Sequence, residues 1–232
     1  MLDTRITMRA DRSALAVARI TKPVDPGYRS DFAVIGHQIM SAQRREGTLL
    51  CDAIQAAFQY SARYIVVRNV HIPISHAVRT VAAAGFAEPR TEMRRCPGGR
   101  GMRVDLVVLD TWTDFSYFLE LKRGVNGIGA DHRARLEDNW RALELIARDV
   151  AAHLFQRPVT EVITYVISYY GKTNFRGNQT LTRDTLDAFF DLPIRESVDA
   201  HLDYFRFRLD THVPGLTGYT GDAGFATPAS GA

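Results

Sequence analysis

Residues 102–122 read MRVDLVVLDTWTDFSYFLELK, and this segment predicts two β-strands joined by a tight turn. Apolar and β-branched side chains dominate residues 104–109, a polar DTWTD follows, and a second apolar run occupies residues 115–122. Side chains alternate between the two faces of a strand, so Glu120 and Lys122 project from the same face. An acidic and a basic side chain therefore lie next to each other.

The register of this hairpin follows from its turn. A turn centred on Trp112-Thr113 pairs residues whose numbers sum to 225, which places Asp105 opposite Glu120. Directly opposed residues have Cβ atoms about 5 Å apart, and two carboxylates that close repel unless a proton, a lysine or a divalent cation lies between them. Asp110 falls on the other face and is predicted to be a turn residue, although a three-residue loop would reverse this choice.

Two carboxylates on adjacent strands suit a hard cation. Mg²⁺ keeps several waters, so one or two carboxylates plus the phosphate oxygens of a substrate are enough to hold it. The pattern Asp105-x14-Glu120-x-Lys122 resembles the active-site signature of the PD-(D/E)XK nuclease superfamily, which has the restriction-endonuclease-like fold. Val104 stands where the name of the family has proline.

This resemblance implies a set of functional residues and a cofactor. Asp105 and Glu120 would bind Mg²⁺, or Mn²⁺ in its place, and Lys122 would orient the attacking water. The family often draws a further acid from a helix before the sheet, which makes Glu46 a weak third candidate beside its alternative as a solvated helix-end glutamate. A solvated edge strand with a cross-strand ion pair is the alternative for the whole cluster.

The rarity of lysine favours the site over surface decoration. The chain has three lysines, Lys22, Lys122 and Lys172, and arginine supplies nearly all other positive charge. A solvent-exposed positive residue without a functional role would therefore more often have been arginine. The carboxylates also lie among apolar strand residues, where an unpaired charge is costly.

Composition favours one globular domain in a reducing compartment. The 232 residues are 46% hydrophobic, carry a net charge of +3 and have a pI near 9.0, which is compatible with nucleic acid without requiring it. Two cysteines are too few for a disulfide framework, and no stretch suits a membrane span or a signal peptide. We expect a cytoplasmic protein without a membrane partner.

The pattern of elements predicts an α/β fold with a restriction-endonuclease-like core, a mixed central sheet flanked by helices. The expected order over residues 47–170 is helix, three strands, a long helix from about 131 to 155, and a strand. Two helices flank Gly47 in this interpretation. We assign residues 1–30 to an N-terminal arm, 31–210 to the nuclease-like domain and 211–232 to a flexible tail.

Basic residues near the hairpin are candidates for contact with DNA. They lie in the glycine-rich turn before the first hairpin strand, at the start of the long helix and in the polar loop after the last strand. Ordinary solvation explains each of them almost as well. The candidates are Arg100, Arg103, Arg133, Arg135, Lys172 and Arg176.

The sequence predicts a Mg²⁺-dependent endonuclease that hydrolyses phosphodiester bonds in DNA, in a restriction or other DNA-defence role. A homodimer on DNA is expected, because cutting both strands at a fixed offset usually needs two sites related by a two-fold axis. Two alternatives remain open. One is a non-catalytic nucleic-acid-binding protein of the same fold, and the other is an unrelated α/β protein with a surface ion pair.

Overall fold

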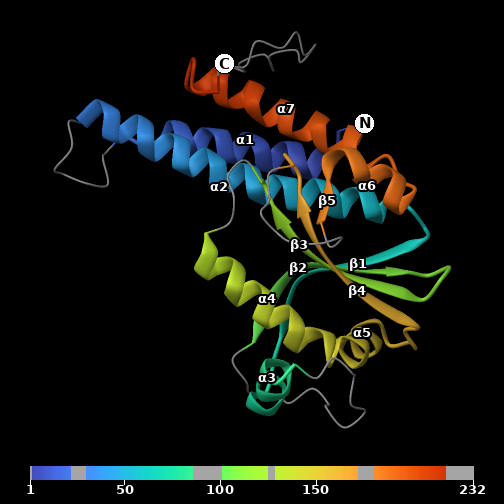
Figure 1. Cartoon of the computed structure of the whole chain (residues 1–232). Helices are drawn as coiled ribbons and strands as arrows, with labels where there is room; N and C mark the ends of the chain where they lie inside the picture. The colour runs from blue at the N-terminus through green and yellow to red at the C-terminus, as the bar shows by residue number, and fades with distance from the viewer. Residues whose placement is uncertain (1, 22–29, 86–100, 125–128, 172–179, 218–232) are drawn as a thin grey trace. The chain divides into compact units, whose positions relative to one another are not determined.

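The structure is a computed structural model that describes residues 2–21, 30–85, 101–124, 129–171 and 180–217 (Figure 1). It divides into two compact units, each described by itself below. Unit 1 consists of residues 1–57 and 193–232, and unit 2 consists of residues 58–192. None of the described helices is long and apolar enough to cross a membrane.

Unit 2 is built on a five-stranded mixed sheet with the order β1-β2-β3-β4-β5. The first three strands run antiparallel, and β3, β4 and β5 run parallel to one another. An α/β fold with a mixed sheet flanked by helices is therefore confirmed. The strands are β1 Tyr64–Ile72, β2 Met102–Asp110, β3 Phe115–Lys122, β4 Glu161–Ser168 and β5 Thr180–Thr182.

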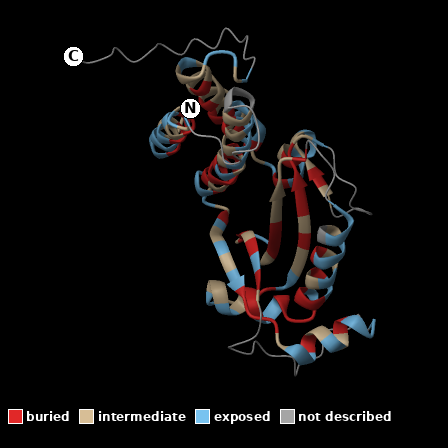
Figure 2. Cartoon of the chain, turned by 90° about the vertical axis from the view of Figure 1, so that its left-hand side faces the viewer, coloured by how far each residue is buried: buried red, intermediate tan, exposed pale blue. Residues whose placement is uncertain are grey.

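One face of this sheet packs against three helices, α3 His76–Ala83, α4 Ala130–Glu144 and α5 Ala147–Phe155. Val107 and Phe118 point to this face and share a buried cluster with Trp140 of α4. Figure 2 shows the buried residues along the strands. Because side chains alternate, Glu120 and Lys122 project from the same face as Phe118.

The other face carries an aromatic cluster under α6 Arg183–Phe190. Tyr117 of β3 lies edge-on to Phe190, with ring centroids 5.3 Å apart, and Phe190 also contacts Phe58 at 4.8 Å. The Tyr64 hydroxyl donates to the main-chain oxygen of Phe190 at 2.7 Å. Burial on both faces fixes the register of the central strands.

The β2–β3 hairpin has the expected register. Leu106 pairs with Leu119 and Asp110 with Phe115, so paired residue numbers sum to 225. The turn, residues 111–114, is centred on Trp112-Thr113. Asp110 is not a turn residue, however, because it is the last residue of β2.

Asp110 is held by a partner far away in the sequence. Its carboxylate accepts from Arg63 Nε at 3.0 Å and from Arg63 Nη2 at 2.7 Å, and Asp110 is fully buried. Burial acts to raise the pKa of Asp110, but hydrogen bonds from Arg63 and from the Trp112 amide outweigh it and lower the pKa. Asp110 lies outside the turn because it still pairs with Phe115, and the spacing of the hairpin gives no indication of Arg63 as its partner.

Two helix boundaries differ from those expected. Helix α2 Ser30–Gln59 continues through Gly47, because one interior glycine costs a helix only about 1 kcal/mol. The expected helix over residues 131–155 is instead α4 and α5, separated at Leu145 and Ile146. Ile146 interrupts the helix because its φ of −124° lies outside the helical range, and both residues are buried in the same cluster as their neighbours.

Unit 1 contains α1 Thr4–Ala18, most of α2, and α7 Ile194–His212. Within the segment assigned to an N-terminal arm, residues 4–18 form α1. Asp3 caps α1 by accepting from the Arg5 amide at 2.8 Å, and the Asp3 amide donates to His201 Nε2 of α7 at 2.8 Å. The expected single domain over residues 31–210 is likewise divided between the two units.

Candidate functional site

Asp105 lies where β2 leaves its regular pairing. The β2–β3 ladder extends from Leu106 to Asp110, and beyond it the Leu121 amide donates to Asp105 Oδ2 at 2.8 Å. A side-chain carboxylate thus takes the place of a main-chain acceptor. The β1–β2 ladder is also interrupted between Asn69 and Asp105, although the residues on both sides pair.

Asn69 explains this second interruption. Its φ of 54° lies in the left-handed region, which non-glycine residues rarely adopt and in which asparagine is enriched. A left-handed residue within a strand bends the chain and removes one pair from the ladder. The half-buried Asp105 is therefore fixed at a bend, with one oxygen bound to the main chain of β3.

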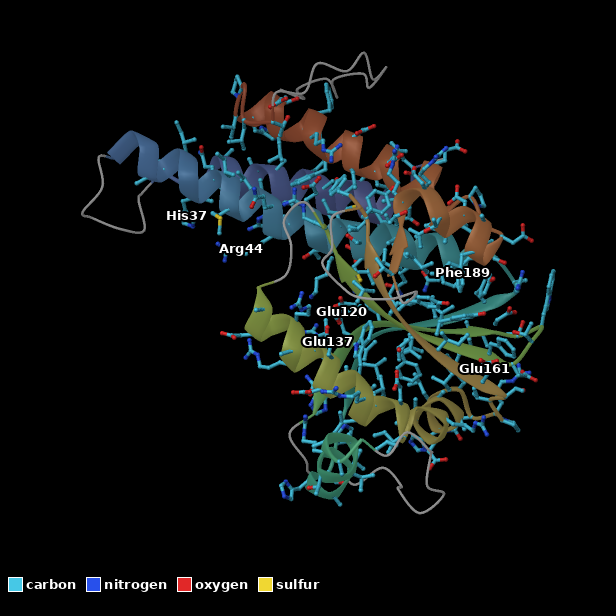
Figure 3. All side chains as sticks on the ribbon, in the orientation of Figure 1. His37, Arg44, Glu120, Glu137, Glu161 and Phe189 are labelled. Carbon is cyan, nitrogen blue, oxygen red and sulfur yellow. The ribbon has the colours of Figure 1, made fainter. Side chains whose placement is uncertain are left out.

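Glu120 and Lys122 form an ion pair on β3. Lys122 Nζ lies 2.6 Å from Glu120 Oε1, and the exposed fractions of the two side chains are 27% and 12%. Glu120 is labelled in Figure 3. The low exposure of Glu120 means that its charge is stabilised mainly by neighbouring groups rather than by water.

The Asp105 carboxylate lies close enough to Glu120 to affect the pKa of Glu120. Burial raises the pKa of Glu120, repulsion from the Asp105 carboxylate raises it further, and Lys122 lowers it by less than these two effects combined. Lys122 therefore does not fully offset two neighbouring negative charges. A second positive charge between the Asp105 and Glu120 carboxylates would be stabilised.

The donor set fits a hard divalent cation. Asp105 and Glu120 supply carboxylate oxygens, and Mg²⁺ commonly takes one or two carboxylates with water and phosphate oxygens. Among the described residues, no group of three or more His, Cys, Asp or Glu side chains could hold a metal ion. The protein would thus provide two ligands and leave the remaining positions to water and substrate.

Glu46, the weak third candidate, has another partner. It lies on α2 in unit 1, where Oε1 accepts from Arg206 Nη2 of α7 at 2.8 Å. Its side chain is 9% exposed. The ion pair with Arg206 indicates a structural role for Glu46 within unit 1. No local pattern in the sequence around Glu46 predicts Arg206 as its partner.

The candidate DNA contacts are only partly described. Arg100, Lys172 and Arg176 lie outside the described residues. Arg103 on β2 and Arg135 on α4 are exposed. Arg133 Nε lies 3.8 Å from Glu137 Oε1 one helical turn later, so an acid in α4 itself accounts for part of its charge.

Sequence reasoning missed two residues beside the hairpin. Ser168, the last residue of β4, pairs in register with Lys122 and is fully buried. Its hydroxyl has no hydrogen-bond partner among the residues described. Gly124 has a φ of 76°, and a Cβ there would collide with the Ser168 hydroxyl. A serine at the end of an otherwise apolar strand was the only available signal.

Comparisons with family models, with curated proteins and with solved structures return no match. The geometry of unit 2 therefore provides the indication of function. That geometry consists of two neighbouring carboxylates and one lysine at the end of the β2–β3 hairpin, and one buried hydroxyl at the end of β4.

Proposed function

We propose that this chain is a metal-dependent nuclease with a restriction-endonuclease-like core, and that it hydrolyses phosphodiester bonds in DNA. The observation that carries the proposal is the proximity of the Asp105 and Glu120 carboxylates on adjacent strands, with Lys122 bound to Glu120. This arrangement concentrates two acids and one base at a single point of the sheet. An ion pair between Lys122 and Glu120 without a functional role would not require a second carboxylate at Asp105.

The order of elements supports the same proposal. Helix α2 is followed by three antiparallel strands, with the short α3 between β1 and β2, then by α4 and α5, and then by β4, which runs parallel to β3. This is the order that the resemblance implies. The carboxylates come from the second and third strands, as in the signature of the superfamily.

Asp105 and Glu120 would bind Mg²⁺, which when bound supplies a Lewis acid that polarises the phosphate and offsets charge on the leaving oxygen. Asp105 is held in place by the Leu121 amide. Lys122 would orient the attacking water and lower its pKa, by stabilising the negative charge that develops on the water oxygen. By resemblance to the superfamily, the product carries a 5′-phosphate.

Contact with DNA would involve the exposed Arg103 and Arg135, together with Arg133. Arginine binds phosphate through its planar guanidinium and leaves sequence recognition to other residues. A restriction or other DNA-defence role suits this chemistry. Two copies related by a two-fold axis would cut both strands of a duplex.

A cleavage assay tests this proposal. Supercoiled plasmid, linear duplex and single-stranded DNA are incubated with the full chain and Mg²⁺ or Mn²⁺, and with EDTA as the metal-free control. We expect metal-dependent cleavage that Asp105→Asn and Lys122→Met abolish. Glu161→Gln removes an exposed carboxylate at the start of β4 and serves as the matched control.

Three results would count against catalysis at this site. Cleavage that survives Asp105→Asn would place the chemistry elsewhere. DNA binding without cleavage under any metal would favour the non-catalytic nucleic-acid-binding protein. The absence of both binding and cleavage would favour an unrelated α/β protein.

A further inference from the structure

The Ser168 hydroxyl is a buried polar group that the proposed chemistry does not yet use. It is fully buried and makes no hydrogen bond to any described residue. Buried hydroxyls are normally satisfied, so an exception calls for a physical reason. Ser168 faces Lys122 across the parallel β3–β4 pair and projects from the same side of the sheet.

Lys122 at present occupies the carboxylate that a metal would need. Its ammonium lies 2.6 Å from Glu120 Oε1. A divalent cation bound to the same carboxylate would repel this ammonium, because like charges a few ångströms apart in a half-buried site interact strongly. Metal binding therefore requires Lys122 to move away from Glu120.

A displaced ammonium needs a new acceptor. Lysine has three donors and no acceptor, and the serine hydroxyl has two lone pairs. Neighbouring strands lie about 4.8 Å apart, which is well within the reach of a lysine side chain from the next strand. Ser168 is in register with Lys122, so its hydroxyl is the nearest candidate on the adjacent strand.

Gly124 keeps this hydroxyl enclosed. The chain turns over Ser168 two residues after Lys122, in a left-handed conformation that glycine adopts without strain. A side chain at position 124 would collide with the Ser168 hydroxyl. The hydroxyl is therefore kept away from bulk water.

We propose that Lys122 has two positions. In the metal-free chain it is the counter-ion of Glu120, and when a divalent cation binds it moves to Ser168, which holds it for the reaction. Ser168 is a positioning residue because it acts through Lys122. The inference rests on the proposed function, since it assumes a divalent cation at Asp105 and Glu120.

Calorimetric titration with Mn²⁺ alone tests the two positions without measuring cleavage. Lys122→Met should bind Mn²⁺ more tightly than the wild-type chain, because the competing ammonium is gone. Ser168→Ala should bind Mn²⁺ about tenfold more weakly, as expected for a lost hydrogen bond to a charged group. Both replacements are modest in size, and thermal unfolding without metal checks that the variants fold.

Ser116→Ala is the matched control. Ser116 lies on the same face at the other end of β3, is fully buried, and also has a hydroxyl without a partner among the described residues. Both serine variants remove one unsatisfied hydroxyl, so their metal-free stabilities should change alike. Only Ser168→Ala should change Mn²⁺ affinity.

A double variant isolates the coupling. In a Lys122→Met background, Ser168→Ala should have no effect on Mn²⁺ affinity, because no ammonium remains to be held. An equal loss in both backgrounds, an unchanged affinity in Ser168→Ala, or weaker binding in Lys122→Met would each overturn the two-position lysine. Failure of the wild-type chain to bind Mn²⁺ would overturn the proposed function as well, which distinguishes the two failures.

Discussion

Replacing Asp110 with alanine should destabilise unit 2 strongly. Asp110 is fully buried and accepts two hydrogen bonds from Arg63, whose side chain is 22% exposed. Removing one partner of a buried ion pair typically costs about 3–5 kcal/mol, and among the described residues Arg63 would keep only the exposed Asp191 at 4.0 Å and the Tyr64 and Trp112 rings as neighbours. For a chain of this size, that corresponds to a fall of roughly 6–20 °C in Tm.

Tryptophan fluorescence during urea unfolding measures this effect in unit 2 alone. Both tryptophans, Trp112 and Trp140, belong to that unit. Asp138→Ala is the control, since its pair with Arg141 is exposed on both sides and should contribute less than about 1 kcal/mol. For Asp110→Ala, a destabilisation of under about 1 kcal/mol would refute the view that this pair fixes the hairpin.

The stability that Asp110 contributes to the folded chain should depend on pH. The folded-state pKa of Asp110 lies below its ordinary value. Its contribution to stability is therefore fully present above the pKa of the unfolded chain, and it is lost as pH falls through the lower folded-state pKa. The difference in the free energy of unfolding between the wild type and Asp110→Ala should become smaller in strong acid.

Three further results are expected from changes at other charged groups. Glu120→Gln should raise the Tm at pH 7. The pKa of Glu120 is raised in the folded chain, so its ionisation makes folding less favourable once the pH exceeds the ordinary pKa of glutamate. Equal Tm values for the variant and the wild type at pH 7 would contradict this. Burial lowers the pKa of His201, so the hydrogen-exchange protection factors of α1 should fall as pH drops below about 6.5, and His201→Gln should remove that dependence. Replacing Arg133 and Arg135 with alanine should reduce the slope of log affinity for DNA against log salt by about 0.9 for each phosphate that is no longer neutralised; an unchanged slope would exclude both arginines from DNA binding.

The hairpin was predictable because its signals are local. Alternation of side chains and a short polar turn fix which residues of β2 face those of β3, and the structure has that register. The caps of α3 and α6 at Ser75 and Thr182 are local in the same way. The sequence therefore placed Asp105 and Glu120 on adjacent strands, although the regular ladder ends one pair before them, at Leu106 and Leu119.

Features that depend on distant partners were not predictable. The partners of Asp110 and Glu46 are 47 and 160 positions away, and no spacing rule connects them. The division into two units likewise depends on α7 belonging with α1, at opposite ends of the chain. Tertiary pairing of this kind overrides local propensity.

The location of the candidate site follows from the way β2 separates from its neighbours. In a regular ladder the Leu121 amide would donate to a main-chain carbonyl, but here it donates to the Asp105 carboxylate. A negative charge is thereby held at a fixed point of the sheet. This charge repels the carboxylate of Glu120, whose side chain has little exposure to water. Lys122 offsets part of this charge in the metal-free chain, and a divalent cation would offset more of it through the same oxygens. The bend at Asn69 and the repulsion between the two carboxylates therefore coincide where we propose that the cation and the scissile phosphate bind.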